Sequence, residues 1–195
     1  MRILSIDIGT KNCAFYIEDF DENEIIKLKK IPKFQTENII ESLYKIGTRV
    51  YWSVENFEKE SEGDIFTQII SYLDSNRKYW DKCNGIIIEK QMKINYNAQV
   101  IQHFIFSYFK NIYGSFKYIS DINATRKTQV LNAPKKMVKK ERKKWAVDET
   151  IRLLKIRKDL KGLKIIDVSK ADDLSDCCLQ LKAFQKLVFI DGGMP

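Results

Sequence analysis

Four acidic residues, widely separated in the chain, have the types and spacing of a divalent-metal site. Asp7 ends one apolar run and Glu89 ends another, and both runs are typical of buried strands. Asp173 and Asp176 lie three residues apart near the C-terminus, a spacing that places both on one face of a helix. A carboxylate at the end of a buried strand is unfavourable unless a cation meets it. In a strongly basic chain, these carboxylates indicate metal-dependent phosphodiester chemistry.

The expected metal is Mg²⁺, which prefers oxygen ligands and keeps positions open for water and phosphate. Two such ions, about 3.5–4 Å apart, would polarise a phosphate and generate hydroxide, and Mn²⁺ is an expected substitute. Asp7 would bridge the ions from its rigid strand, and Glu89 would complete one of them. Because the metal activates the water, the only histidine, His103, is expected to be a packing or surface residue and not a base.

Each acid also has an ordinary structural interpretation when it is taken alone. Asp7, followed by Gly-Thr, could be a turn former, and Glu89 could form a surface ion pair with Lys90. Asp172 and Asp173 could simply favour a helix dipole. Their occurrence together, in this order and beside these elements, favours a shared site.

The basic charge is concentrated in one block of the chain. Residues 135–164 contain ten lysines and three arginines against four acids, a local net charge of +9, whereas the whole chain carries +8. Such a block predicts a polyanionic partner, and a membrane surface is disfavoured because no lipidation motif accompanies it. Lys11 and Lys90 follow the strand-end acids and are further candidates for phosphate contacts. The block's candidates for DNA contact are Lys135, Lys136, Lys139, Lys140, Arg142, Lys143 and Lys144.

The size and composition are those of one globular domain spanning residues 1–195. The chain is 44% hydrophobic, and no apolar run approaches the roughly 20 residues needed to cross a bilayer. Its four cysteines lack zinc-like spacing, so we expect reduced thiols and a cytoplasmic location.

Apolar periodicity predicts the elements that must position the acids. We expect strands at 2–8, 13–17, 24–31, 86–89 and 116–120. We expect helices at 38–46, 65–73, 95–112, 124–131, 136–156 and 172–188, with a break at Pro134 before the basic helix. Residues 50–63 are ambiguous. This order, an antiparallel meander followed by alternating strands and helices, predicts a mixed α/β sheet.

Three segments carry a resemblance to a known family: Ser5–Asn12, Ile87–Gln91 and Lys170–Asp176. In their residues and order they resemble RuvC-type Holliday junction resolvases, especially the poxvirus enzymes and, more distantly, the fungal mitochondrial ones. The resemblance covers nearly the whole chain. It implies a ribonuclease H-like mixed sheet with helices on both faces.

The same resemblance implies a function. It implies a homodimer that uses magnesium to make paired nicks in four-way DNA junctions, with Asp7, Glu89, Asp173 and Asp176 as ligands. Asp172 is a competitor for the third position. In poxviruses, this activity would resolve concatemeric replication intermediates in the host cytoplasm. A two-fold dimer suits a junction that is itself approximately two-fold, and recognition would rest on DNA shape.

Three alternatives stay open. Asp7-Ile8-Gly9-Thr10 also resembles the phosphate loop of the actin, Hsp70 and sugar-kinase superfamily, but 195 residues are too few for two lobes around a nucleotide, so no nucleotide cofactor is expected. A second alternative is an inert, structure-selective DNA-binding protein. A third is a ribonuclease H-like nuclease acting on flaps, three-way branches or RNA–DNA hybrids.

Overall fold

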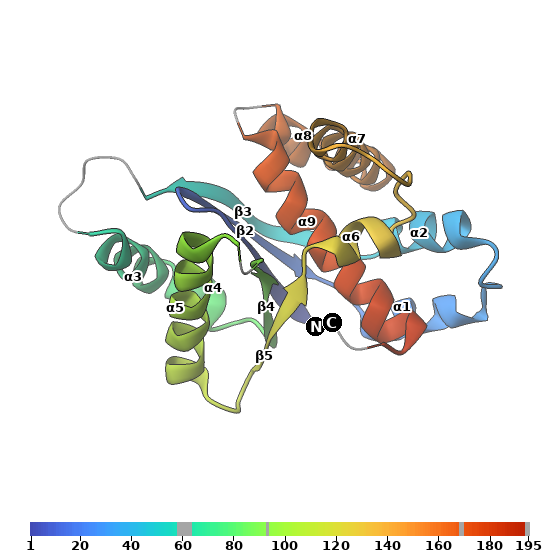
Figure 1. Ribbon diagram of the computed structural model, residues 1–195. Helices are drawn as coiled ribbons and strands as arrows, with labels where there is room; N and C mark the ends of the chain where they lie inside the picture. Colours follow the sequence, from blue (N-terminus) through green and yellow to red (C-terminus); the bar gives the residue numbers. More distant parts are fainter. Residues whose placement is uncertain (58–63, 93, 168–169, 194–195) are drawn as a thin grey trace.

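The computed structural model describes residues 1–57, 64–92, 94–167 and 170–193, and a five-stranded mixed sheet forms its centre (Figure 1). The strand order is β3-β2-β1-β4-β5. β1 pairs antiparallel with β2 and β2 with β3, whereas β4 runs parallel to both β1 and β5. The strands are β1 Arg2–Ile8, β2 Asn12–Asp19, β3 Thr48–Asn56, β4 Gly85–Lys90 and β5 Tyr118–Asn123.

Helices cover both faces of the sheet and create two hydrophobic cores (Figure 1). Three helices pack on one face: α3 Ile65–Ser75, α4 Arg77–Trp80 and α5 Tyr96–Tyr113. The helices associated with the other face are α1 Glu22–Lys27, α2 Thr36–Lys45, α6 Thr125–Val130, α7 Lys139–Arg157, α8 Leu160–Ile166 and α9 Ala171–Gln185. A 3₁₀ turn, η1 Leu28–Lys30, follows α1, and a π-helical segment, η2 Lys186–Asp191, follows α9. The predicted sheet and its two helical layers are confirmed.

The predicted strand at 24–31 is wrong, because this segment forms α1 and η1. Asp21 caps the helix by accepting a 2.9 Å hydrogen bond from the Asn23 amide, and only Ile25 of α1 is buried. The third strand of the meander is β3, Thr48–Asn56, most of which lies in the stretch 50–63 that the pattern left ambiguous. Residues 58–63 of that stretch lie outside the described residues.

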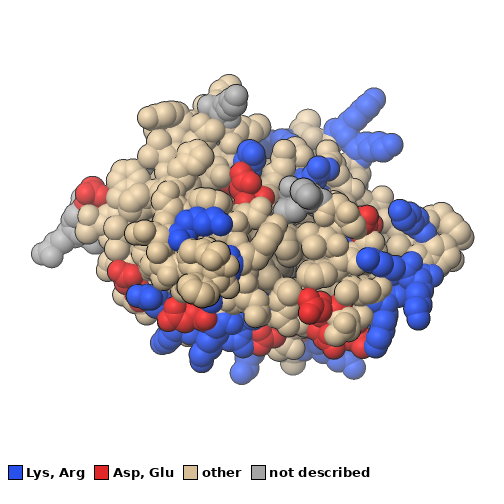
Figure 2. Space-filling model, turned by 90° about the horizontal axis from the view of Figure 1, so that it is seen from below, with Lys and Arg blue, Asp and Glu red and all other residues tan. Residues whose placement is uncertain are grey.

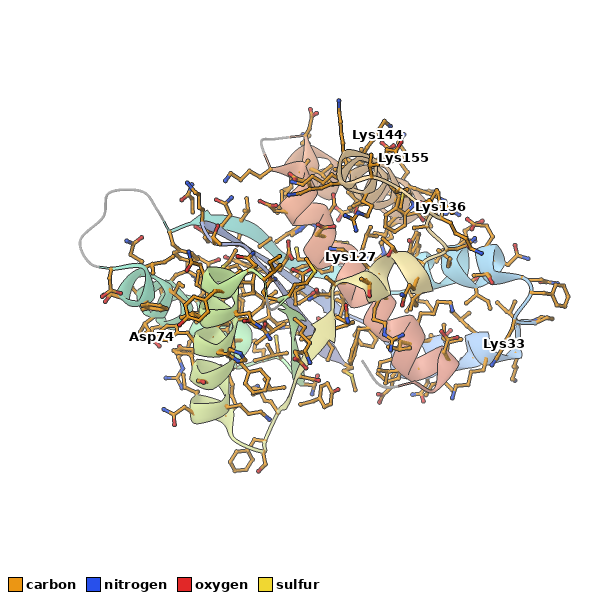
Figure 3. The ribbon with its side chains drawn as sticks, in the orientation of Figure 1. Lys33, Asp74, Lys127, Lys136, Lys144 and Lys155 are labelled. Carbon is orange, nitrogen blue, oxygen red and sulfur yellow. The ribbon has the colours of Figure 1, made fainter. Side chains whose placement is uncertain are left out.

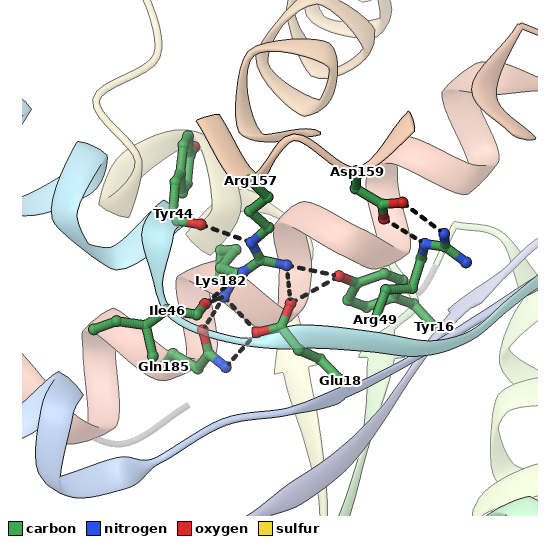
Figure 4. Close-up of polar contacts among 9 residues, drawn as sticks. All are labelled: Tyr16, Glu18, Tyr44, Ile46, Arg49, Arg157, Asp159, Lys182 and Gln185. Atoms are coloured by element: carbon green, nitrogen blue, oxygen red, sulfur yellow. Dashed lines mark hydrogen bonds and ion pairs between the residues drawn. The ribbon is translucent and has the colours of Figure 1, made fainter. Parts of the chain in front are cut away.

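A buried ionic cluster joins β2 to α7 and α9 (Figure 4). The Glu18 side chain is fully buried, and its carboxylate contacts the ammonium of Lys182 and the guanidinium of Arg157, the latter at 2.6 Å. Tyr16 and Gln185 donate further hydrogen bonds to Glu18, at 2.7 and 3.0 Å. These contacts hold the long basic helix and the acid-bearing helix against the sheet.

Candidate active site

Asp7 and Glu89 lie side by side on neighbouring strands. The parallel pairing of β1 and β4 aligns Ile6 with Ile88, so the next residue on each strand is one of the two acids. Side chains alternate between the faces of a strand. Ile3 and Ile87 belong to the core beneath α9, and the same alternation directs Asp7 and Glu89 to that face.

Backbone turns and amides hold the ends of these two strands. Gly9 donates a 2.8 Å hydrogen bond to the Asn12 carbonyl, and a Cβ at this position would lie only 2.7 Å from that oxygen. Gln91 bridges the strands, because its side-chain amide donates to the Ile8 carbonyl at 3.0 Å and to the Glu89 carboxylate at 2.7 Å. These contacts fix the positions from which the Asp7 and Glu89 side chains project from the sheet.

The third element of the site is the first part of α9, which crosses the same face of the sheet (Figure 1). Gln180 donates to the Ser5 hydroxyl and the Ile6 carbonyl, each at 3.1 Å. The Trp52 indole donates to the Leu174 carbonyl at 3.0 Å. Together these bonds attach the helix to β1 and β3 and bring its acidic first turns to the ends of the strands.

A lysine that the sequence analysis did not single out lies among the acids. Lys127 of α6 places its ammonium 2.9 Å from Asp176 Oδ1 and 3.6 Å from Glu89 Oε1, and its side chain is only 12% exposed (Figure 3). It belongs to a short, largely polar helix, and nothing in its sequence context distinguishes it from other lysines. Only the packing of α6 beside α9 reveals its position.

Burial and neighbouring carboxylates shift the pKa values of the site residues. Burial, followed by the neighbouring Glu89 carboxylate, raises the pKa of Asp7 well above its ordinary value. Burial also raises the pKa of Asp176, although Lys127 opposes the change. The pKa of Asp173 is raised by partial burial and then by Asp172. The pKa of Lys127 is raised because Asp176, Glu89 and Asp7 outweigh the effect of its burial.

The donor set fits a hard divalent cation, since every candidate ligand offers carboxylate oxygen. The Lys127 ammonium already contacts two of these carboxylates, which shows that the cluster attracts positive charge. Within the described part of the chain, no three carboxylate, histidine or cysteine side chains form a ready-made metal site. Asp7, Glu89 and Asp176 therefore lie around one cation, Lys127, and a bound metal would have to displace the Lys127 ammonium or bind beside it.

Asp172 differs from Asp173 in its contacts. The Asp172 carboxylate forms an ion pair with the ammonium of Lys143 on α7, and this interaction lowers its pKa against the effect of burial. Asp172 is therefore already paired with a cation, whereas burial and Asp172 raise the pKa of Asp173.

The candidate phosphate contacts occupy several positions. Lys90 points to the opposite face from Glu89 and lies 3.3 Å from Asp121, and Lys11 is in the exposed turn after β1. Lys144 pairs with Asp148 at 2.5 Å and points away from the acid cluster (Figure 3). The remaining candidates are exposed on α7 or the loop before it: Lys135, Lys136, Lys139, Lys140, Arg142 and Lys143.

Basic side chains are not confined to α7. The side of the molecule away from α7 and α8 also carries lysine and arginine, interspersed with aspartate and glutamate around its rim (Figure 2). This mixture agrees with the sequence, in which residues outside 135–164 have almost no net charge.

The other sequence expectations can be located as well. His103 is exposed on α5, which packs against the face opposite the acid cluster. Cys13, Cys83, Cys177 and Cys178 are buried free thiols. Among the described residues, no helix combines the length and apolar character required to cross a bilayer.

Comparisons with known proteins identify relatives by sequence and by structure. No family model matches the chain. It is 27% identical to the uncharacterized protein 97L of Invertebrate iridescent virus 3 over 209 residues, covering 95% of this chain and all of the relative.

Two solved structures are similar over nearly the full length. The Fowlpox virus resolvase, solved with its substrate Holliday junction DNA, matches with a TM-score of 0.64 and 20% identity, covering 96% of this chain and 99% of that one. Thermus thermophilus RuvC, also in complex with a Holliday junction substrate, gives a TM-score of 0.58 at 9% identity, covering 95% and 96%. The chain therefore has the ribonuclease H-like fold of the RuvC-type resolvases.

Proposed function

We propose that this protein is a Mg²⁺-dependent, structure-selective endonuclease that resolves four-way DNA junctions by paired nicks. One observation carries the proposal: Asp7 and Glu89 lie on adjacent strands beneath the acidic turns of α9, in a fold shared with proteins solved on Holliday junctions. Asp7, Glu89, Asp173 and Asp176 are the proposed catalytic ligands.

The proposed cofactor is a pair of Mg²⁺ ions, with Mn²⁺ as a substitute. Bound metal would polarise the scissile phosphate and supply hydroxide near neutral pH. The role of the protein is to hold the four carboxylates on rigid elements, with Gln91 orienting Glu89 and Gln180 and Trp52 positioning α9. The raised pKa values of Asp7 and Asp176 are consistent with this choice, because they reflect burial first and then neighbouring carboxylates, which Lys127 only partly offsets.

The proposed assembly is a homodimer. Four-way junctions are approximately two-fold symmetric, so two copies related by a two-fold axis would present one acid cluster to each of two symmetry-related strands. We place this activity on viral DNA replication or recombination intermediates in the host cytoplasm. The similarity to proteins of iridescent viruses supports the viral setting.

A comparison of DNA substrates tests the proposal. The purified full chain is incubated with a four-way junction, a three-way branch, a linear duplex and an RNA–DNA hybrid, with Mg²⁺ and with EDTA. We expect paired, Mg²⁺-dependent nicks on the junction in preference to the other substrates. Preferential cleavage of the hybrid or the three-way branch would assign the fold to a different nuclease activity, and binding without cleavage would indicate an inert junction-binding protein.

A matched pair of variants connects the activity to the acids. Asp7→Asn should abolish cleavage and leave junction binding largely intact, because it removes a ligand without disturbing the basic surface. Asp74→Asn makes the same chemical change on α3, across the sheet, and should retain activity (Figure 3). Equal loss of binding and cleavage in Asp7→Asn would count against a metal-binding role.

A further inference from the structure

A groove adjoins the acid cluster and separates it from the basic helix α7. Its volume is about 400 Å³, with Lys127 and Asp176 on one side and Lys139, Arg142 and Lys143 on the other. A second groove of about 470 Å³ continues from it and is lined by Lys135 and Lys136. Thr128 and Arg142 line both grooves, so the two form a continuous track that leads away from the acids.

Only one face of α7 contributes to this track. Lys139, Arg142 and Lys143 recur at the i, i+3, i+4 spacing of a single helical face. Lys140 and Lys144 line neither groove, although they belong to the same basic segment. The helix therefore divides its charge between a face that meets the acid cluster and a face that does not.

The track has the chemistry of a nucleic-acid strand site. Proteins that hold single strands combine a basic groove along the backbone with aromatic surfaces for bases. Here Trp145 and Ala146 provide an apolar part of the lining, and Arg142 and Lys139 provide charge. Lys143 is already held by Asp172, which leaves Lys139 and Arg142 as the side chains best placed to meet phosphates.

The size of the track matches one strand. A volume of about 400 Å³ lies in the range of small-molecule sites and suits a nucleotide unit. A strand that has left its complement locally would therefore suit this track.

Building on the proposed function, we propose that the track holds the cleaved DNA strand as a single strand beside the acid cluster. Lys139 and Arg142 bind the phosphates next to the scissile one, and Lys135 and Lys136 bind those that follow. Selection for branched DNA would then arise partly from this requirement for a locally unpaired strand, and these basic residues are positioning residues that align the scissile phosphate.

The test compares two variants with equal charge loss. The Lys139→Gln/Arg142→Gln variant removes two charges from the track. The Lys155→Gln/Lys161→Gln variant removes two from the same basic block, where Lys155 lies ~24 Å further along α7 and on its opposite face. Binding to a single-stranded oligonucleotide and to a four-way junction is measured without Mg²⁺ over a range of salt concentrations, and single-turnover cleavage is measured at saturating junction with Mg²⁺.

The track variant should lower the slope of log affinity against log salt for the single strand by about 1.4, since two phosphate contacts are lost and each contributes about 0.7 on a single strand. Its cleavage rate at saturating junction should fall about tenfold or more through misalignment of the phosphate. The control variant should change the cleavage rate less than twofold. Equal effects of both variants on slope and rate would overturn the proposed track. Binding that follows the predicted pattern, with no cleavage of any substrate by the wild type, would instead overturn the proposed nuclease and leave the track standing.

Discussion

The buried Glu18 cluster gives the most direct quantitative prediction, through the substitution Glu18→Gln. The change keeps the side-chain shape but leaves two buried cations, Arg157 and Lys182, without their carboxylate (Figure 4). Removing one partner of a buried ion pair typically costs about 3–5 kcal/mol. The pKa of Glu18, lowered to about 2 from 4.5 because Arg157 and Lys182 outweigh its burial, corresponds to about 3 kcal/mol at neutral pH. We expect the free energy of unfolding to fall by this amount.

The two cations of the cluster are not equivalent. The pKa of Lys182 is lowered to about 8, because burial and the nearby Arg157 outweigh the attraction of Glu18. The Glu18 carboxylate therefore pairs with two cations, whereas Lys182 has one carboxylate that it shares with the Arg157 guanidinium. Lys182→Met should consequently destabilise the protein by less than half as much as Glu18→Gln.

Urea unfolding followed by tryptophan fluorescence, in EDTA at pH 7, measures both variants. The slope of unfolding free energy against urea concentration should be the same in the wild type and both variants. A shift of the urea midpoint then measures a change in stability. Because the folded pKa of Glu18 is depressed, its contribution is present above about pH 4.5 and is lost as the pH falls towards 2. The difference between wild type and Glu18→Gln should therefore shrink over that interval. A loss below about 1 kcal/mol at pH 7, or a larger loss for Lys182→Met, would refute the reasoning.

Three further predictions concern the site and its supports. Asp7→Asn should raise the free energy of unfolding in EDTA by about 1 kcal/mol, since it removes a buried charge and its repulsion with Glu89, and an unchanged or lower melting temperature would contradict this. Gly9→Ala should cost about 1–3 kcal/mol of unfolding free energy and reduce cleavage, because its Cβ would lie 2.7 Å from the Asn12 carbonyl oxygen. A urea midpoint and a nicking rate equal to those of the wild type would contradict this. Trp52→Phe should cost about 1–2 kcal/mol through loss of the bond to the Leu174 carbonyl, and a urea midpoint equal to that of the wild type would exclude a supporting role.

The main elements could be predicted because their signals are local. Apolar runs ending in Asp7 and Glu89 identify two central strands, and helical periodicity identifies α5 and α9. The segment 24–31 misled the prediction because its isoleucines suit a strand, whereas a capping aspartate and helical charge placement decide its structure.

Other features depend on contacts that no local pattern encodes. Lys127 reaches the acids only because α6 packs beside α9, and its short helix has no distinguishing periodicity. Glu18 would be expected at the surface from its residue type alone, yet partners 139 and 164 residues away make its burial possible. The division of the basic helix into two faces likewise emerges only once the neighbouring elements are in place.

The acid cluster draws on β1, near the start of the chain, and on α9, near its end. During synthesis, a nascent polypeptide would lack α9 until the segment Ala171–Gln185 had been made. A product ending at a premature stop codon between Glu89 and Asp173 would likewise keep Asp7 and Glu89 but lack their helical counterparts. Chains that lack α9 would thus be unable to assemble the carboxylate set. A partly synthesised chain would therefore not have the proposed nuclease activity.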